Sequence, residues 1–399
     1  MALNVNRVRH LENAMVHFER AIATENGPRI SIDSHLRSYH AAHRNGLSLE
    51  DKEWLSDKFK DIYRWKSLLD NFSKDQSTPS VGERLRTYFV SEGWRSYTNS
   101  KRLPEHIRLS IPEELFNTLS KQYGKEKSRK IASTYNEKPA TFLRVNRLVE
   151  SRDTIIKNLS SKGITAEPTM TSEIGIKISR NPKLLQAPEL VVDRSIELQD
   201  ESCQIIGSQV DIPQNHKGTL VLDYCAGSGG KSLVFGPDMG GKGHLYVHDI
   251  NHRYLIQARN KLRSAKIGNF TLLNNSTESG SEKMKNLCHK KMDWIIVDAP
   301  STGSGQYRRY PDRKWLYSDK FLSQCVERQR EIFKSALKFL KPKKGKILYS
   351  VSSILSAETW DQLTYFCDTH GLYLCYEPVH SVPVSHGMDG FFCATLEKK

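Results

Sequence analysis

The sequence lacks any long hydrophobic run. No apolar stretch approaches the roughly 18 residues that a membrane-spanning helix needs. The N-terminus lacks the apolar segment of a secretory signal, and Glu12 and Glu19 are atypical of a transit peptide. These absences predict a soluble, cytoplasmic protein with no membrane partner.

Cysteine is absent from the first half of the 399-residue chain, and all seven cysteines lie between positions 203 and 393. None forms a CxxC pair or a Cys/His cluster with the spacing of metal ligands. We therefore expect reduced thiols and no bound metal.

Acidic residues are in short supply, with 45 Asp+Glu against 60 Lys+Arg and a net charge of +15. Residues 1–150 carry +7 and residues 151–399 carry +8, so the excess does not come from one basic tail. A distributed positive field suits nucleic acid, and it suits an anionic membrane surface almost as well. An apolar content of 38% excludes wholesale disorder.

The pattern of apolar and polar residues changes along the chain and predicts three regions. Residues 1–135 read as a helical region, with apolar stripes in 8–23 and after the candidate N-cap Ser48. Residues 136–200 read as a small α+β module, with strands at 141–145 and 175–178 around a helix at 151–162. Residues 201–399 alternate apolar strands with helices, which predicts an α/β domain with a doubly wound, mostly parallel sheet.

The first motif is the glycine-rich turn of residues 223–231 (DYCAGSGGK), which follows a predicted strand and opens a helix. Glycines here let the backbone approach a ligand closely, and Asp249 closes the next strand, where a carboxylate can accept hydrogen bonds from a ribose. The spacing does not match GxxxxGK[ST], which disfavours ATP. The turn therefore predicts a nucleoside cofactor, although a purely structural turn would also explain it.

The second motif is the stretch 298–315 (DAPSTGSGQYRRYPDRKW) at the end of another predicted strand. Ligands of open parallel sheets bind at this edge, and paired arginines among aromatics suit an RNA backbone and its bases. An ordinary polar loop with solvated arginines is the alternative. A third segment, 349–353 (YSVSS), ends the following strand without the GxSxG turn of a hydrolase.

Together with residues 142–146 (FLRVN), 199–204 (QDESCQ) and 389–392 (DGFF), these motifs resemble the RsmB/NOP/NSUN family of RNA 5-methylcytosine methyltransferases. The resemblance is strong over about residues 110–399. The helical front is less specifically similar to the NusB-like domain that some bacterial members carry.

The resemblance implies a class I methyltransferase (Rossmann-like) fold that binds S-adenosylmethionine and an RNA, by family analogy a ribosomal one. The implied cofactor residues are Cys225, Ala226, Gly227, Ser228, Gly229, Gly230, Lys231, Asp249, Asn275 and Asp298. The implied RNA-binding residues are Arg144, Asn146, Arg308 and Arg309.

The chain departs from the family at the catalytic positions. In the family one cysteine attacks C6 of cytosine and a second helps to release the product; their positions here are Ser352 and Ser301. A thiol titrates near ~8.5 and is readily activated, whereas a serine hydroxyl needs an adjacent base, and no histidine lies within four residues of Ser352. No catalytic residue is therefore assigned.

The leading hypothesis is an RNA-binding protein on the methyltransferase fold, with impaired or absent cytosine-5 chemistry. One alternative is an active RNA methyltransferase that uses another nucleophile or target atom. A second is a non-catalytic scaffold for ribosome assembly or protein binding.

Overall fold

A computed structural model of the chain describes residues 4–23, 30–74, 79–91, 93–180, 195–213 and 218–398. These residues form two compact units, one of 1–138 with 306–321 and one of 139–305 with 322–399. This division differs from the three predicted regions, because 306–321 groups with the N-terminal helices and the small module groups with the sheet. Residues 181–194 of the expected module lie outside the described residues. No described helix is both long and apolar enough to cross a membrane.

The first unit is helical, as its apolar stripes predict. Ser48 caps its helix through a reciprocal pair of hydrogen bonds with Asp51: the Ser48 hydroxyl accepts from the Asp51 N–H at 3.1 Å, and the Asp51 carboxylate accepts from the Ser48 N–H at 3.0 Å. The helices pack around a core that includes Leu11, Phe18 and Phe59. They are α1 (Val5–Ile22), α2 (Ile32–Ala42), α3 (Leu49–Arg64), α4 (Lys66–Asp70), α5 (Val81–Val90), η1 (Trp94–Asn99), α6 (Glu105–Arg108), α7 (Glu113–Tyr123) and α8 (Lys125–Tyr135).

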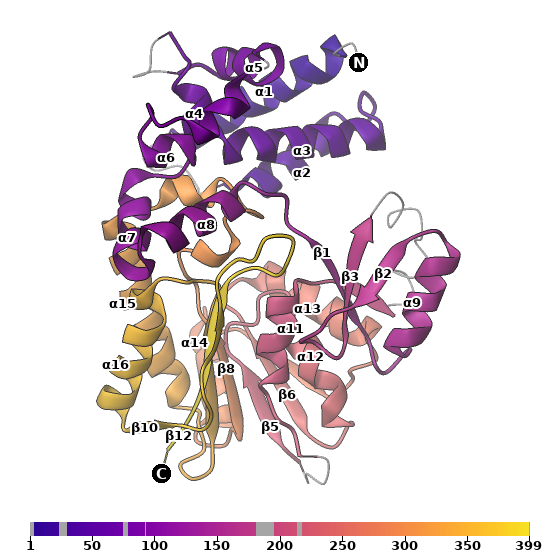
Figure 1. The fold of residues 1–399 in the computed structure, drawn as a ribbon. Coiled ribbons are helices and arrows are strands. Elements are labelled where there is room, and N and C mark those ends of the chain that lie inside the picture. The colour runs from indigo at the N-terminus through magenta and orange to yellow at the C-terminus, as the bar shows by residue number, and fades with distance from the viewer. Residues whose placement is uncertain are drawn as a thin grey trace. The chain divides into compact units, whose positions relative to one another are not determined.

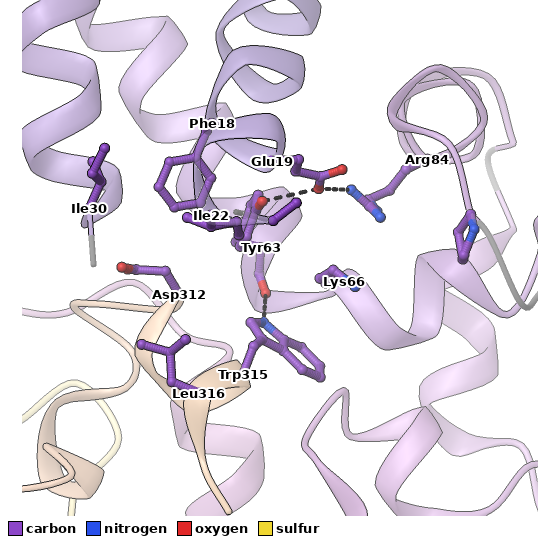
Figure 2. Close-up of a pocket in the computed structure, with 12 residues that line it drawn as sticks. Phe18, Glu19, Ile22, Ile30, Tyr63, Lys66, Arg84, Asp312, Trp315 and Leu316 are labelled. Atoms are coloured by element: carbon purple, nitrogen blue, oxygen red, sulfur yellow. Dashed lines mark hydrogen bonds and ion pairs between the residues drawn. The ribbon is translucent and has the colours of Figure 1, made fainter. Parts of the chain in front are cut away.

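The segment 306–321, with η5 (Arg313–Leu316), completes this unit although it comes from the distant second motif. The indole of Trp315 donates to the carbonyl of Tyr63 at 2.9 Å. Trp315 and Leu316 line a cavity of about 400 Å³ together with Phe18 and Tyr63. Figure 2 shows these side chains around it. The segment therefore supplies part of the interior of the helical unit.

The second unit begins with the small module, an antiparallel sheet in the order β2-β3-β1-β4. Its core packs α9 on the sheet through Ile155 and Leu159. The elements are β1 (Thr141–Val145), α9 (Arg152–Ser161), β2 (Thr165–Pro168), β3 (Gly175–Arg180) and β4 (Ile196–Leu198).

The large sheet has the order β10-β12-β9-β8-β5-β6-β7, with β11 paired to β12. Strands β7, β6, β5, β8 and β9 are parallel, whereas β12 runs antiparallel between β9 and β10. Its elements, of which Figure 1 labels the longer helices and several strands, are α11 (Glu201–Ser208), β5 (Leu220–Asp223), α12 (Ser232–Phe235), η3 (Gly236–Met239), β6 (His244–His248), α13 (His252–Ser264), β7 (Phe270–Leu273), α14 (Glu278–Cys288), β8 (Trp294–Asp298), η4 (Ser304–Gln306), α15 (Asp319–Leu337), β9 (Lys346–Val351), η6 (Ser356–Glu358), α16 (Trp360–His370), β10 (Leu372–Leu374), β11 (Val379–Ser381) and β12 (Phe391–Lys398).

Side chains alternate between the two faces of the sheet along each strand. Helices cover both of these faces. Val221 and Ile296 face α11, α12 and α13 in one core. Leu222 and Ile295 face α14, α15 and α16 in the other. The predicted α/β fold class, a Rossmann-like sheet preceded by a small α+β module and N-terminal helices, is confirmed.

Candidate functional site

The glycine-rich turn lies at the carboxyl end of β5, where loops of a parallel sheet carry ligands. Gly227 and Gly229 adopt φ values of +53° and +82°, a left-handed region that other residues rarely enter. A Cβ on Gly229 would lie 3.2 Å from the Cβ of Ala258, so the turn packs closely on α13. No atom lies within 4 Å of the Cβ position of Gly227, which leaves open space beside the backbone there.

Asp249, directly after β6, is tied to this turn. One carboxylate oxygen accepts from the Gly227 N–H at 2.9 Å, and the other accepts from the Asn251 N–H at 2.7 Å. The neighbouring Ile250 is 62% exposed. A carboxylate beside an exposed apolar surface suits a ribose that carries a base.

Two asparagines follow β7 and complete the same edge. The Asn274 amide donates to the carbonyl of Asp249 at 2.8 Å and so fixes the loop that carries the carboxylate. Asn275, the predicted cofactor residue, is half-buried next to it, and its carbonyl accepts from the Ser281 hydroxyl at 3.1 Å.

Asp298 ends β8 and forms an ion pair with Lys231 of the glycine turn. Its second oxygen accepts from the Ser350 hydroxyl at 2.9 Å. Burial alone lowers the pKa of Lys231, but the Asp298 carboxylate outweighs that effect and raises the pKa above its ordinary value. Lys231 therefore stays positively charged, and its ion pair with Asp298 joins the turn after β5 to the end of β8.

Two buried oxygens around the turn have no hydrogen-bond partner among the described residues, Asp223 Oδ1 and Gln199 Oε1. The other oxygen of Asp223 accepts from the Ser232 hydroxyl at 2.7 Å, and the Gln199 amide donates to the carbonyl of Gly230 at 2.8 Å. Unsatisfied buried acceptors are rare, and here both suit a ligand that brings N–H donors. The residues present thus fit the ammonium-bearing end of an amino-acid cofactor.

Ser301 and Ser352 lie in loops that leave the same edge of the sheet, because β8 and β9 pair in parallel with Asp298 opposite Ser350. Both serines are half-buried. Ser301 Oγ accepts from the Gly303 N–H at 3.2 Å. Among the described residues, Ser352 Oγ has no hydrogen-bond partner, so no base in them is placed to take its proton.

A buried carboxylate underlies both serine loops. Glu358 accepts from the N–H and hydroxyl of Thr302 at 2.8 and 2.5 Å, from the Ser353 hydroxyl at 2.5 Å and from the Gln329 amide at 2.9 Å. Burial raises the pKa of Glu358, and these donors oppose that shift. The loops after β8 and β9 are therefore held in one geometry whether or not their side chains react.

Burial disfavours the reactive thiolate form of several cysteines in this unit. All seven cysteines are free. Burial raises the pKa of Cys393 to about 12 and that of Cys375 to about 11, and it also raises the pKa of Cys225. A raised pKa keeps these groups as unreactive thiols at neutral pH.

Arg144 and Asn146, which the resemblance implied as RNA contacts, are only 3% and 2% exposed. The Arg144 guanidinium donates to the carbonyl of Leu233 at 3.1 Å and pairs with Glu197 at 2.9 Å. The Asn146 amide donates to the carbonyl of Ala265 at 3.2 Å. Both side chains join the small module to the helices of the large sheet, which favours a structural role for them.

Arg308 and Arg309 lie in the first unit. Arg308 is fully buried, and its carbonyl accepts two hydrogen bonds from the Arg64 guanidinium, at 2.9 and 3.1 Å. Arg309 is half-buried. Of the predicted RNA-binding residues, only Arg309 thus keeps a partly exposed side chain.

Four residues of this region were not predicted from the sequence as site residues: Gln199, Asn274, Ile250 and Glu358. Gln199 stands in the 199–204 motif that carries the resemblance, so its position was available as a signal. Ile250 and Asn274 directly follow strand ends at the ligand edge, and that position alone was enough to nominate them. No group of three or more His, Cys, Asp or Glu in the described part of the chain is arranged to hold a metal.

The strand order, the antiparallel β12 and the glycine turn after β5 define a Rossmann-like methyltransferase. Residues 210–397 match the family model described as 16S rRNA methyltransferase RsmB/F, and residues 111–184 match the ferredoxin-like domain of the RsmF/B-like methyltransferases. Both regions are therefore similar to domains of the RsmB/RsmF-type rRNA methyltransferases. The match to a methyltransferase family confirms the predicted cofactor, S-adenosylmethionine.

Individual relatives agree with the family matches. The chain is similar to ribosomal RNA small subunit methyltransferase B of Photorhabdus laumondii, with 29% identity over 72% of this chain and 66% of the relative, and to that of Proteus mirabilis, with 29% over 66% and 60%. It thus spans somewhat under two thirds of the length of these relatives. Among solved structures, it shares its fold with PH0851 (TM-score 0.77, 18% identity, all of both chains) and with a methyltransferase homologue from Pyrococcus horikoshii (TM-score 0.63, 23% identity, 74% of this chain and 97% of that one).

Proposed function

We propose that the chain binds S-adenosylmethionine and ribosomal RNA but transfers the methyl group to C5 of cytosine poorly or not at all. The observation that carries this proposal is the Ser352 hydroxyl, which stands at the position of the family's attacking cysteine and has no hydrogen-bond partner among the described residues. Because an unactivated hydroxyl is a weak nucleophile, C6 of the cytosine is not attacked and C5 does not become nucleophilic.

The proposed cofactor residues lie around one edge of the sheet. Residues 225–231 surround the methionine end, where Asp223 and Gln199 supply the unsatisfied acceptors. Asp249 accepts from the ribose, and the exposed side chain of Ile250 covers one face of the adenine. Lys231 and Ser350 hold Asp298 at the boundary between cofactor and target base. S-adenosylmethionine supplies an electrophilic methyl group when bound.

RNA binding is proposed from the curated relatives, which are ribosomal RNA methyltransferases, and from the net charge of +15. Among the RNA-binding residues that the resemblance implied, the half-buried Arg309 is the one proposed to contact a phosphate. Arg144, Asn146 and Arg308 support binding indirectly, by holding the small module and the helical unit in shape.

Two measurements on the purified chain test the proposal. Calorimetry with S-adenosylmethionine should show binding, which Asp249→Ala weakens at least tenfold. Transfer of a tritiated methyl group to ribosomal RNA should stay near background in the wild type and rise at least a hundredfold in the double variant Ser301→Cys, Ser352→Cys. The single variant Ser301→Cys is the matched control, because it restores the releasing thiol without the attacking one.

Each contrary result has a definite meaning. Strong transfer by the wild type that Ser352→Ala abolishes would show that the serine itself reacts. Strong methyl transfer to an atom other than C5, at a rate that Ser352→Ala leaves unchanged, would favour an active enzyme that methylates a different atom. No binding of S-adenosylmethionine would favour a scaffold.

A further inference from the structure

The positive charge of the chain is concentrated in two segments outside the proposed site. Residues 283–293 and 334–346 together carry ten lysines and one aspartate, a net charge of +9 against +15 for the whole chain. The remaining residues of 151–399 therefore sum to −1.

The fold brings the two segments side by side at the amino end of β8 and β9. The Lys290 N–H donates to the carbonyl of Lys338 at 3.3 Å, and the Lys341 N–H donates to the carbonyl of Met292 at 2.9 Å. A parallel bridge joins Met292 to Leu340 between them. Neighbouring backbones of this kind lie about 5 Å apart, so their lysines share one surface.

Six exposed lysines make up this surface, here called the lysine patch: Lys290, Lys291, Lys338, Lys341, Lys343 and Lys344. Within the described chain only Lys341 is ion-paired, to Asp293 at 2.8 Å. Lys291 donates to the neutral carbonyl of Asn286 at 2.7 Å and keeps its charge uncompensated. Like charges held this close repel one another unless an anion lies between them.

Two of these lysines occupy backbone positions that favour glycine. Lys290 has φ +56° and Lys344 has φ +61°, both in the left-handed region. Glycine would relieve the strain at either position, yet both carry a long cationic side chain. What lysine adds at these two positions is charge and not a fit to the backbone.

We propose that the lysine patch is a second RNA-binding surface, which contacts the phosphate backbone of a segment distant from the target nucleotide. The inference rests on the proposed function for the identity of the partner as RNA. Lysine amines act as point charges without the planar fork of arginine, so the contact is independent of base sequence. Strand β8 separates the patch from Asp298 by about 13 Å at 3.3 Å per residue, so one nucleotide does not reach both.

The first test compares two quadruple variants that lose the same charge. Lys290, Lys338, Lys343 and Lys344 are all changed to Gln in the patch variant. Lys121, Lys125, Lys127 and Lys130, exposed on the helical unit, are all changed to Gln in the control. Anisotropy of a labelled RNA hairpin at several KCl concentrations should show at least tenfold weaker binding for the patch variant at 100 mM and a shallower log–log salt slope. The control should bind within threefold of the wild type.

The second test separates charge from folding. Lys290→Gly with Lys344→Gly removes two charges and relieves two strained positions. It should weaken binding of the hairpin while the thermal midpoint stays the same or rises. A lowered midpoint with unchanged affinity would show that the lysines serve the turns and would overturn the proposal.

The remaining outcomes are also decisive. If the wild type and the patch variant bind RNA equally tightly, the lysine patch is not an RNA-binding surface, and the proposed function is unaffected. Equal losses in both quadruple variants point to net charge alone and overturn it too. A wild type that binds no RNA overturns both proposals, and a patch variant that loses binding only to phosphatidylserine vesicles assigns the surface to a membrane.

Discussion

Asp223 is an acidic side chain that the fold buries completely at the end of β5. It is 1% exposed, and burial raises its pKa to about 7, although the Ser232 hydroxyl and the nearby Lys231 favour the charged form. In the unfolded chain an aspartate titrates near ~3.9. The same residue thus connects the stability of the fold with the electrostatics of the proposed cofactor site.

This shift predicts the pH dependence of stability. Between pH 4 and 7 the folded chain holds a proton on Asp223 that the unfolded chain has lost, so the free energy of unfolding falls as pH rises, by up to about 1.4 kcal/mol per pH unit. Asp223→Asn should remove this dependence. Denaturant unfolding at pH 5, 6 and 7 should show the wild type losing stability relative to the variant, and parallel curves would contradict the assignment.

At the same scale, the sequence was informative where a backbone requirement dictates the residue. Gly227 and Gly229 occupy the left-handed positions expected of a ligand-binding turn, and Ser48 forms the predicted cap. For Arg308 the sequence was uninformative, because a basic residue in a polar loop is expected to be exposed to solvent. Its burial depends on Arg64, 244 positions earlier in the chain, and no local pattern encodes that pairing.

Among the elements, the loops that follow β8 and β9 depend on one carboxylate from η6. Glu358 receives hydrogen bonds from Thr302 and Ser353, one in each loop, and from Gln329 of α15. The resemblance identified both loops from their motifs. The network beneath them was beyond prediction, since it joins residues up to 56 positions apart.

Removal of this carboxylate should loosen both loops. Glu358→Ala leaves several buried donors unsatisfied and should lower the free energy of unfolding by about 3 kcal/mol. Glu358→Gln retains the shape and part of the hydrogen bonding, so a loss of about 1 kcal/mol is expected. Urea unfolding measures both, with Asp361→Ala, on the exposed surface of α16, as the control. Equal effects of Ala and Gln would show that charge, and not the donor network, is what the site requires.

For the whole molecule, the notable feature is a helical unit whose chain is not continuous. Lys314 is fully buried in it and donates to the carbonyls of Arg64 and Ser110 at 2.7 and 2.6 Å and to the Asn136 side chain at 3.0 Å. Burial lowers the pKa of Lys314 well below its usual value. Three acceptors from distant helices thus depend on one side chain of segment 306–321.

A fragment of residues 1–138 should consequently be incomplete. Its thermal midpoint should rise when a synthetic peptide of residues 306–321 is added, by an amount equivalent to about 2.7 kcal/mol at 100 times the Kd. A peptide with Lys314→Met should not produce the rise, because it leaves the three acceptors unpaired. A peptide with Lys320→Met, changed at an exposed lysine, is the matched control. An unaltered midpoint with the native peptide would show that the fragment is complete without it.

The interrupted chain of this unit also has a consequence during synthesis. The helices of residues 1–138 leave the ribosome first, but the segment that fills their interior follows after 167 further residues. At translation speeds of 5–20 residues per second, this interval lasts roughly 10 to 30 seconds. For that time the apolar faces of the nascent helices lack one of their partners. The helical unit therefore gains this partner only after translation has passed Phe321.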